Sequence, residues 1–275
     1  MLRTRPWPKI LDTISTEIGK SRELVQGPGG NISWKCDQIM WVKASGMCLA
    51  DAEVLEIFCK VALGNPLVSI ESNGIRPSIE ASLHAIPQDA FVIHTHSVGA
   101  MTLGFMKTLN DSAMQLLSEF SIGAIEYARP GIALSKKIQE ALDVQESLKG
   151  VLLKNHGLVL WGENLEDLYD FLLDFEKKVC RQFPVIEEVS FRIKNMNLFN
   201  YLGNRFLTPD HAVFGNDMKL QSLLNEKNWI GDLRYAIETS LSRIGIDEEI
   251  SYLSDLEAKE LQDWEWEKLR RTLNT

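Results

Sequence analysis

The sequence predicts a mixed α/β fold, a layered domain in which helices cover a central sheet. Short apolar runs bounded by glycine, proline or asparagine are typical of buried strands. Between these runs lie longer segments with apolar residues three or four positions apart, as in helices that pack one face on a sheet. This mixed order favours an α/β or α+β arrangement, and 275 residues suffice for one large domain with an appended segment.

The first expected elements are a helix and a pair of strands. Apolar residues recur at helical spacing over residues 10–18. A Gly-Pro-Gly-Gly-Asn run ends this helix, and two apolar segments, 32–35 and 39–43, surround a turn at 36–38. We therefore expect a strand pair after the first helix. Residues 67–71 predict a further short strand.

Two more helices are expected in the same part of the chain. Asp51 suits the N-cap of the first, because its carboxylate can accept hydrogen bonds from free backbone N–H groups. The inner face of that helix would hold Leu55, Phe58, Cys59 and Ala62. Pro77 suits the first position of the second helix, which would continue through Ala85.

The next segments predict the middle of the sheet. Residues 91–96, Phe-Val-Ile-His-Thr-His, indicate a strand, and residues 98–107 indicate a helix. Residues 150–161 contain two apolar runs split by Asn-His-Gly, which predicts a strand pair with a histidine at the break. A long helix follows, and its apolar side is made of Leu165, Leu168, Leu172, Phe175 and Val179.

The composition changes after residue 210, so we predict a main domain over 1–210 and a charged helical extension over 211–275. The extension has fewer strand signals and more charged segments. Ser254 and Glu257 form a capping-box pattern at the start of a final helix. That helix would contain Trp264, Trp266 and Leu269. Its many charges are typical of a solvated helix face.

Composition and charge exclude several classes of partner. The formal net charge of −9 argues against nucleic acid or an anionic membrane surface, since both need a basic face. No apolar run is long enough to span a membrane, and the first residues lack the apolar stretch of a signal peptide. The cysteines show no metal-binding or disulfide spacing, which favours reduced thiols in a cytoplasmic protein. They are Cys36, Cys48, Cys59 and Cys180.

Three of the five histidines lie in two of the predicted strand segments. His94 and His96 are two apart on one strand, so their side chains point to the same face. His156 lies at the break of the later strand pair and could complete a set of three imidazoles. Three nitrogen ligands with an open fourth position are typical of catalytic Zn²⁺, although Fe²⁺, Mn²⁺ or Co²⁺ could also bind. The alternative is that these are core histidines that happen to alternate.

A carboxylate precedes the first histidine segment. Glu80 could serve as a fourth metal ligand at rest or as a catalytic base near the metal. The alternative is an ordinary solvent-facing glutamate on a helix. His84 lies one turn further along the same helical face, where a packed or hydrogen-bonded histidine is more expected than a further ligand.

Two glycine-containing turns could bind an anion. Residues 27–31 and 43–46 each adjoin a predicted strand, and their backbone N–H groups could cradle a negatively charged group. Neither has the spacing of a Walker loop, and each is also compatible with a simple tight turn.

Taken together, these segments resemble the class II aldolase/adducin family, and in particular the zinc-dependent aldolases of L-fuculose phosphate and L-rhamnulose phosphate. The resemblance covers residues 8–210. It is carried by GPGGNISWK (27–35), WVKASG (41–46), RPSIEASLH (76–84), FVIHTHSVGAM (91–101) and LLKNHGLVLWGEN (152–164). Residues 206–213 also resemble the segment that follows the aldolase part in aldolase/short-chain dehydrogenase fusions.

The resemblance assigns roles to individual residues. It implies that His94, His96 and His156 bind the metal and that Glu80 is the catalytic carboxylate. The family's phosphate pocket falls on Asn31, Ser45, Gly46 and Ser78.

Two positions depart from the family pattern. Where the family has a second serine this chain has Ile79, which leaves recognition of a phosphate open. The tyrosine that protonates the aldehyde in the fuculose enzyme has no counterpart in residues 109–117, and Tyr127 matches a different position.

The resemblance also implies a fold, an assembly and a reaction. The fold would be a three-layer one with a mostly antiparallel central sheet flanked by helices, and the assembly a homotetramer. The reaction would be reversible retro-aldol cleavage of a ketose phosphate or related sugar, with the metal stabilising an enediolate while Glu80 leaves the metal and shuttles a proton. A dehydratase or a 4-epimerase of the same family is an alternative, although the epimerases tend to carry Asp in place of Glu80. A non-enzymatic, adducin-like interaction module is a further alternative, but adducin heads lack the metal ligands.

Overall fold

A single sheet forms the centre of the protein. The computed structural model describes residues 5–71, 75–196, 198, 202, 203, 205–214, 229–245 and 250–263. Within these ranges eight strands pair in the order β4-β3-β2-β1-β5-β8-β7-β6. Neighbouring strands are antiparallel except for β6 and β7, which are parallel. The strands are β1 (Asn31–Cys36), β2 (Ile39–Lys43), β3 (Phe58–Ala62), β4 (Asn65–Ser69), β5 (Phe91–Thr95), β6 (Ile122–Ile125), β7 (Gly150–Leu153) and β8 (Gly157–Gly162).

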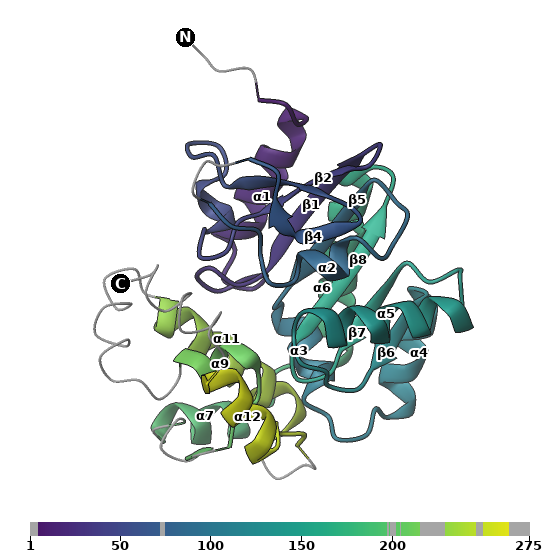
Figure 1. The fold of residues 1–275 in the computed structure, drawn as a ribbon. Coiled ribbons are helices and arrows are strands. Elements are labelled where there is room, and N and C mark those ends of the chain that lie inside the picture. The colour runs from purple at the N-terminus through teal and green to yellow at the C-terminus, as the bar shows by residue number, and fades with distance from the viewer. Residues whose placement is uncertain are drawn as a thin grey trace.

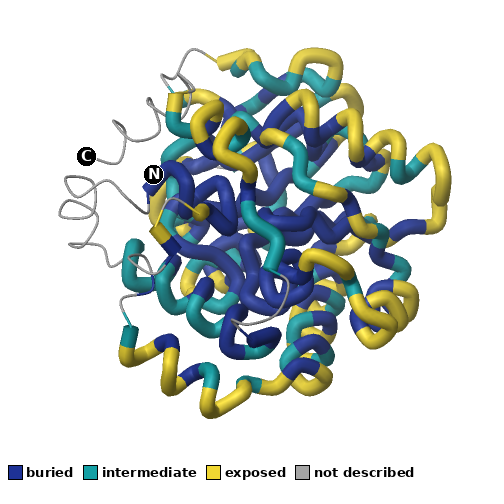
Figure 2. The backbone as a smooth tube through the Cα atoms, turned by 90° about the horizontal axis from the view of Figure 1, so that it is seen from below, coloured by how far each residue is buried: buried dark blue, intermediate teal, exposed yellow. Residues whose placement is uncertain are grey.

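Helices cover both faces of this sheet, which gives three layers (Figure 1). One face packs against α1 (Lys9–Lys20), α3 (Val98–Gly104), α4 (Asp111–Glu119) and α6 (Leu165–Gln182). The other face packs against α2 (Ala81–His84) and α5 (Ile132–Val144). The predicted class, a mostly antiparallel sheet between helical layers, is therefore confirmed. Buried residues are concentrated in the middle of the molecule, and exposed residues surround them (Figure 2).

Successive side chains of β5 point alternately toward one helical layer and toward the other. Phe91 and Ile93 lie in the large core cluster beneath α1, α3 and α6. Val92 lies in the cluster on the opposite face, together with Leu83 of α2. Because alternate side chains of a strand share a face, His94 projects toward the layer that contains α2.

The C-terminal helices form a group beside α3 (Figure 1). They are α7 (Glu187–Asn195), α9 (Pro209–Phe214), α11 (Trp229–Ile244) and α12 (Asp255–Asp263). Helix α11 packs against α3 and α7, and α12 packs against α9. The chain that precedes α12 is also tied to the end of α3, because the N–H of Ser251 donates to the carbonyl of Phe105 at 2.8 Å. No helix among the described residues is both long and apolar enough to cross a membrane.

The prediction of a helix after Asp51 is wrong. A short 3-10 helix, η1 (Leu49–Asp51), is followed by β3, which pairs with β2. Leu55, expected on the inner face, is 47% exposed, whereas Phe58 is buried. Apolar residues at 55, 58, 59 and 62 fit helical spacing, but the backbone groups of β2 require a neighbouring strand. Pairing across the sheet therefore overrides the local pattern.

The helix predicted to begin at Pro77 is shorter than expected. Helix α2 begins only at Ala81, and Pro77 forms an isolated antiparallel bridge with Ala44. The N–H of Ser78 donates to the carbonyl of Lys43 at 3.0 Å. Pro77 and Ser78 are therefore paired with the end of β2, which prevents an earlier helix start.

The other expected elements are present. The helix over 10–18, the strand pair that follows it, β5, α3, the β7/β8 pair and the apolar side of α6 are confirmed, and β4 begins two residues earlier than expected. The capping box is confirmed at α12, where the Ser254 N–H donates to Glu257 Oε2 at 2.7 Å. The N–H of Glu257 donates in return to Ser254 Oγ at 3.3 Å. Trp264, Trp266 and Leu269 lie outside the described residues.

Candidate metal centre

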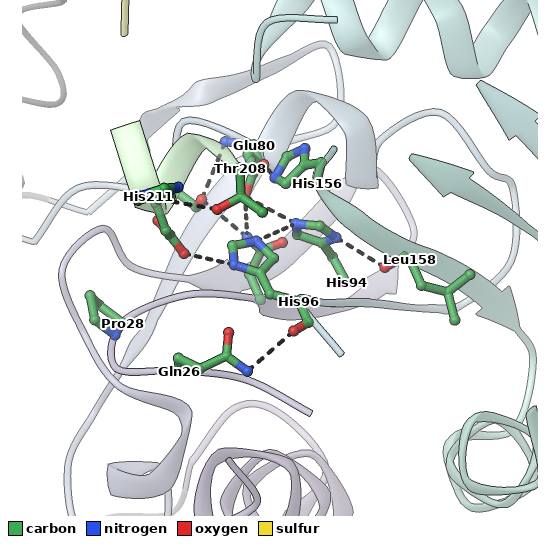
Figure 3. A network of polar contacts seen from close by, with 12 residues as sticks. Gln26, Pro28, Glu80, His94, His96, His156, Leu158, Thr208 and His211 are labelled. Carbon is green, nitrogen blue, oxygen red and sulfur yellow. Dashed lines mark hydrogen bonds and ion pairs between the residues drawn. The ribbon is translucent and has the colours of Figure 1, made fainter. Parts of the chain in front are cut away.

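Three imidazoles and one carboxylate meet on the face of the sheet that carries α2. His94 and His96 come from the end of β5, His156 from the turn between β7 and β8, and Glu80 from the N-cap of α2. One ligand atom from each residue can be chosen so that all four lie within 4.8 Å of one another, and all four residues are buried. Figure 3 shows the three imidazoles pointing toward one another. The sequence prediction that these residues could reach one ion agrees with this geometry.

The tight turn between β7 and β8 brings His156 beside β5. Asn155 has a φ of 56°, a left-handed conformation that asparagine tolerates better than most residues. Gly157 follows, and a Cβ at this position would lie 2.1 Å from the carbonyl oxygen of Thr95. Only glycine allows β8 to approach β5 this closely, so the Asn-His-Gly sequence is required for the position of His156.

Hydrogen bonds at Nδ1 orient the two histidines of β5. His94 Nδ1 donates to the carbonyl of Leu158 at 3.0 Å, and His96 Nδ1 donates to Asp210 Oδ2 at 2.7 Å. Because the carbonyl and the carboxylate accept, the protons sit on Nδ1 and the lone pairs on Nε2. These two Nε2 atoms are 3.1 Å apart. Two lone pairs at this distance repel each other unless a cation or a proton lies between them.

Glu80 completes the group. Its Oε1 lies 3.1 Å from His156 Nε2, and its Oε2 lies 3.5 Å from His94 Nε2. The side-chain amide of Asn31 donates to Oε2 at 2.8 Å. Among the described residues, Oε1 is buried and accepts no hydrogen bond.

The donor set fits a divalent cation. Ligands about 2.1 Å from a tetrahedral Zn²⁺ lie roughly 3.4 Å from one another. The nitrogen and oxygen atoms of this cluster are separated by 3.1 to 3.5 Å where they are nearest neighbours. Three nitrogens and one oxygen are also ligands that Zn²⁺, Fe²⁺, Mn²⁺ and Co²⁺ accept. The residues therefore could hold such an ion.

Burial and mutual charge set the protonation of the cluster. Burial lowers the pKa of His156 to about 4, so this imidazole is neutral at neutral pH. Burial alone would raise the pKa of Glu80, but the neighbouring His94 and His156 hold it well below its ordinary value. Burial likewise opposes the charged form of His94, but the Glu80 carboxylate outweighs it and raises the pKa of His94. The centre thus contains an ionised carboxylate and a neutral ligand, as metal binding requires.

Asn31 and Ser78, expected in a phosphate pocket, lie against Glu80. The Asn31 amide nitrogen is 3.4 Å from Ser78 Oγ, and this hydroxyl also accepts from the Glu80 N–H at 3.2 Å. The amide oxygen of Asn31 is hydrogen-bonded to His84 Nε2, while His84 Nδ1 bonds Ser33 Oγ at 2.8 Å. The expectation that His84 is a hydrogen-bonded histidine is confirmed. Asn31 is therefore engaged in holding Glu80 in this structure.

Ser45 and Gly46 form the turn after β2, where Gly46 has a φ of 77°. The N–H of Ser45 donates to the carbonyl of Arg76 at 2.8 Å, which links this turn to the segment before Ser78. Buried Lys43 donates through Nζ to the carbonyl of Pro28 at 2.7 Å and joins the same turn to the glycine-rich loop. The three segments that the sequence singled out therefore converge, and their role toward a substrate stays a prediction.

Asp210 is a site residue that sequence reasoning did not assign. It lies on α9, 114 residues from His96, and its carboxylate accepts from the imidazole of His96. Neither its spacing nor its neighbours in the chain indicate this contact. Only the docking of α9 on the loop before β1 brings the two side chains together.

The chain belongs to the family described as Class II Aldolase and Adducin N-terminal domain, whose profile matches residues 14–182, more than half of the sequence. The matched range contains Glu80 and the three histidines but ends before Asp210.

Three relatives illustrate the range of the family. The chain is 31% identical over 183 residues to the uncharacterised oxidoreductase YuxG of Bacillus subtilis, covering 56% of this chain and 26% of YuxG. It is 29% identical over 131 residues to a methylthioribulose-1-phosphate dehydratase of Pseudomonas syringae, covering 38% of this chain and 64% of the dehydratase. A 3-oxo-tetronate 4-phosphate decarboxylase of Pectobacterium atrosepticum is 26% identical, with 57% and 74% covered. The chain spans about a quarter of the first relative and less than two thirds of the second.

Two solved structures share the fold. The N-terminal class II aldolase domain of a Thermoplasma acidophilum protein aligns with a TM-score of 0.55 at 21% identity, over 66% of this chain and 96% of that one. YgbL of Klebsiella pneumoniae, a putative aldolase/epimerase/decarboxylase, aligns with a TM-score of 0.51 at 19% identity, over 92% and 96% of the two chains. Similarity at these identities concerns the fold alone.

Proposed function

We propose that this protein is a metal-dependent carbon–carbon lyase, an aldolase that cleaves a ketose phosphate or a related sugar. The observation that carries the proposal is the contact of the buried Glu80 carboxylate with His94 and His156, inside a set of three convergent imidazoles. A proton-transfer group held against three metal ligands suits chemistry at a carbon next to a carbonyl group.

His94, His96 and His156 would hold the cation through their Nε2 atoms, with Glu80 as a fourth donor. Zinc is the first choice because of the imidazole ligands, and Mn²⁺, Fe²⁺ or Co²⁺ are alternatives. A divalent cation bound there supplies positive charge for the oxyanion that develops on the substrate carbonyl when the carbon–carbon bond breaks.

Glu80 would deliver and remove the proton at the carbon freed by cleavage. Asn31 fixes Oε2 through its amide, so the other oxygen, Oε1, is the one available to exchange a proton. His84 Nε2 in turn is hydrogen-bonded to the Asn31 amide oxygen. This chain of contacts keeps the carboxylate directed at the centre and accounts for two buried polar residues outside the ligand set.

We propose that the substrate's anionic end binds where the 43–46 turn meets the segment that carries Ser78. Ser45, Gly46 and Ser78 belong to these two segments. Lys43 adds a positive charge at the start of the turn, where its Nζ donates to the carbonyls of Pro28 and Met47. Ile79 replaces a hydroxyl there with an apolar side chain, so a singly anionic sugar acid is the alternative to a phosphate.

A substrate panel tests the proposal. Ketose 1-phosphates and the matching free sugars and sugar acids would be incubated with zinc-loaded protein, and aldehyde release would be followed with a coupled reductase. We expect cleavage of at least one ketose derivative, loss of activity with chelator, and no activity in Glu80→Gln. Loss of water or carbon dioxide without aldehyde release would contradict the aldolase assignment.

Dehydration is the second candidate, favoured by the similarity to a methylthioribulose-1-phosphate dehydratase. The same carboxylate and imidazoles would serve, because dehydration also begins with proton removal beside a carbonyl group. The two reactions differ in product. Dehydration yields one product that lacks a water molecule, whereas cleavage yields two fragments, and mass spectrometry of the reaction mixture separates them.

We also propose that the protein assembles as a homotetramer and that residues 211–275 form an extension to the 1–210 domain. Family resemblance supports both proposals. Helix α9 crosses the proposed boundary, since it runs from Pro209 to Phe214. Light scattering of the purified protein tests the assembly, and limited proteolysis followed by mass analysis tests the boundary.

A further inference from the structure

The geometry points to Asp210 as the positioning residue of His96, so that the C-terminal segment, defined as residues 205–214 and 250–253, completes the metal centre. This inference rests on the proposed metal site and adds a group from outside the range that the family profile matches. Asp210 does not itself belong to the set of candidate ligands. Its role would be to fix the orientation of a ligand.

The Asp210–His96 contact is short and buried. The two side chains are 2.7 Å apart, and the residues are 4% and 5% exposed. The loop before β1 is shaped around them, because a Cβ on Gly29 would lie 2.9 Å from His96 Nδ1 and 3.0 Å from Asp210 Oδ2. The side-chain amide of Gln26 also donates to the carbonyl of His96 at 3.2 Å. Both the ring and the backbone of His96 are therefore held in place.

The partner of His96 is charged, whereas the partner of His94 is a neutral carbonyl. A carboxylate that accepts from Nδ1–H keeps the proton on that nitrogen and directs the Nε2 lone pair at the metal. Loss of such a partner weakens metal binding by about 10- to 100-fold in general.

The C-terminal segment also holds the turn that carries the third histidine. The Asn155 amide, one residue before His156, donates to the carbonyls of Leu207 at 3.1 Å and Ser251 at 2.8 Å. Asn155 and Asp210 thus link two separate ligand-bearing segments, the β7–β8 turn and the end of β5, to the same part of the chain. A segment that contacts two ligand positions in this way is built into the centre.

The experiment measures metal affinity rather than turnover. Wild type, Asp210→Asn and Asp210→Ala would be stripped of metal, and their Zn²⁺ affinity measured by competition with a chromophoric chelator. Co²⁺ absorption spectra would report the ligand geometry. The matched control is Gln262→Ala, which removes the 3.1 Å hydrogen bond from α12 to the Ala212 carbonyl on α9 but leaves Asp210 and His96 intact.

We expect about 10- to 100-fold weaker Zn²⁺ binding for Asp210→Ala, a smaller loss for Asp210→Asn, and a changed Co²⁺ spectrum for both. The Zn²⁺ affinity of Gln262→Ala should lie within about threefold of wild type, which is a smaller change than the loss of a hydrogen-bond partner of a metal ligand causes. Asp210→Asn is nearly isosteric, so it remains informative if Asp210→Ala fails to fold.

Two results would overturn the inference on its own: wild-type affinity and spectra in both Asp210 variants, or an equal loss in Gln262→Ala. Failure of the wild type to bind any of these ions would overturn the proposed metal centre together with it. If the wild type binds Zn²⁺ but cleaves no sugar, only the proposed reaction is contradicted.

Discussion

Asn31 and His94 are direct partners across the pairing of β1 and β5, and this register places the Asn31 amide 2.8 Å from the Glu80 carboxylate. The amide therefore lies on the same face as the imidazole and reaches the group that contacts it. In this structure the Asn31 amide nitrogen holds Glu80, and the expected contact of Asn31 with a phosphate stays a prediction. Asn31 thus connects the sheet to Glu80 and to the candidate metal ligands.

Removal of this amide should impair catalysis more than metal binding. A hydrogen bond to a charged group contributes about 1.5–3 kcal/mol, so Asn31→Ala should lower kcat by roughly 10- to 100-fold. Zinc content, measured by plasma mass spectrometry, should stay near that of the wild type. The matched control is Asn195→Ala, since the exposed amide of Asn195 donates to the carbonyl of Phe191 in its own helix at 2.8 Å. A complete loss of zinc in Asn31→Ala would show instead that the amide is needed to assemble the ligand set.

Glu80→Gln should separate metal binding from turnover. The substitution keeps the shape of the side chain and its bond to Asn31 but removes the group that exchanges a proton. General acid–base groups contribute about 10²- to 10⁴-fold, and we expect a loss of kcat in that range with zinc retained. A variant with wild-type kcat would refute the role of Glu80 as the proton-transfer group.

Gly157 tests the close approach of β8 to β5. A Cβ there would meet the Thr95 carbonyl at 2.1 Å, so Gly157→Ala must displace the backbone beside His156. We expect a loss of about 1–3 kcal/mol in the free energy of unfolding, together with weaker zinc binding. Gly64→Ala is the control, because a Cβ on Gly64 meets nothing within 4 Å. Equal stability of the two variants in urea unfolding would be inconsistent with the described strand packing.

Glu176 should make stability depend on pH. Its carboxylate, on α6, accepts from Ser97 Oγ at 2.6 Å and from the Gly99 N–H at 2.8 Å. Burial nevertheless raises the pKa of Glu176 from 4.5 to about 7. Between these values the folded state keeps a proton that the unfolded state has released, so stability falls as pH rises from about 4.5 to 7 and is level above.

The corresponding variant is Glu176→Gln, which should lack this dependence. The raised pKa of Glu176 implies a destabilisation on the order of 3 kcal/mol at pH 8 that is absent below about pH 4.5. Urea unfolding should therefore show the variant more stable than wild type at pH 8, with the difference shrinking at pH 5. Exposed Glu146→Gln serves as the control. A difference that grew toward low pH would have the wrong sign for a buried neutral carboxyl.

The period of two in β5 and the Asn-His-Gly break were sufficient to predict the triple-histidine arrangement from sequence. Both features are local, since they depend on neighbouring residues and on the conformations that those residues allow. The long apolar side of α6 could be predicted for the same reason. Local patterns were therefore enough to predict most of the strands and the segments that carry the three histidines.

Contacts set by register and by docking could not be predicted in this way. The spacing of Leu55, Phe58 and Cys59 suits a helix as well as a strand, and only the free edge of β2 decides between them. The pairing of Asp210 with His96 requires that α9 dock on the loop before β1, which no sequence period encodes. Where the outcome depends on distant parts of the chain, the sequence pattern alone was insufficient.

The stoichiometry and identity of bound metal test the central claim most directly. Wild type and His156→Ala would be reconstituted with Zn²⁺, freed of excess ion by gel filtration and analysed by plasma mass spectrometry. The account predicts about one zinc per chain in the wild type and nearly none in His156→Ala, since a three-nitrogen site loses most of its affinity with one ligand. A wild type that retains no divalent ion, or a His156→Ala variant that retains a full equivalent, would contradict it.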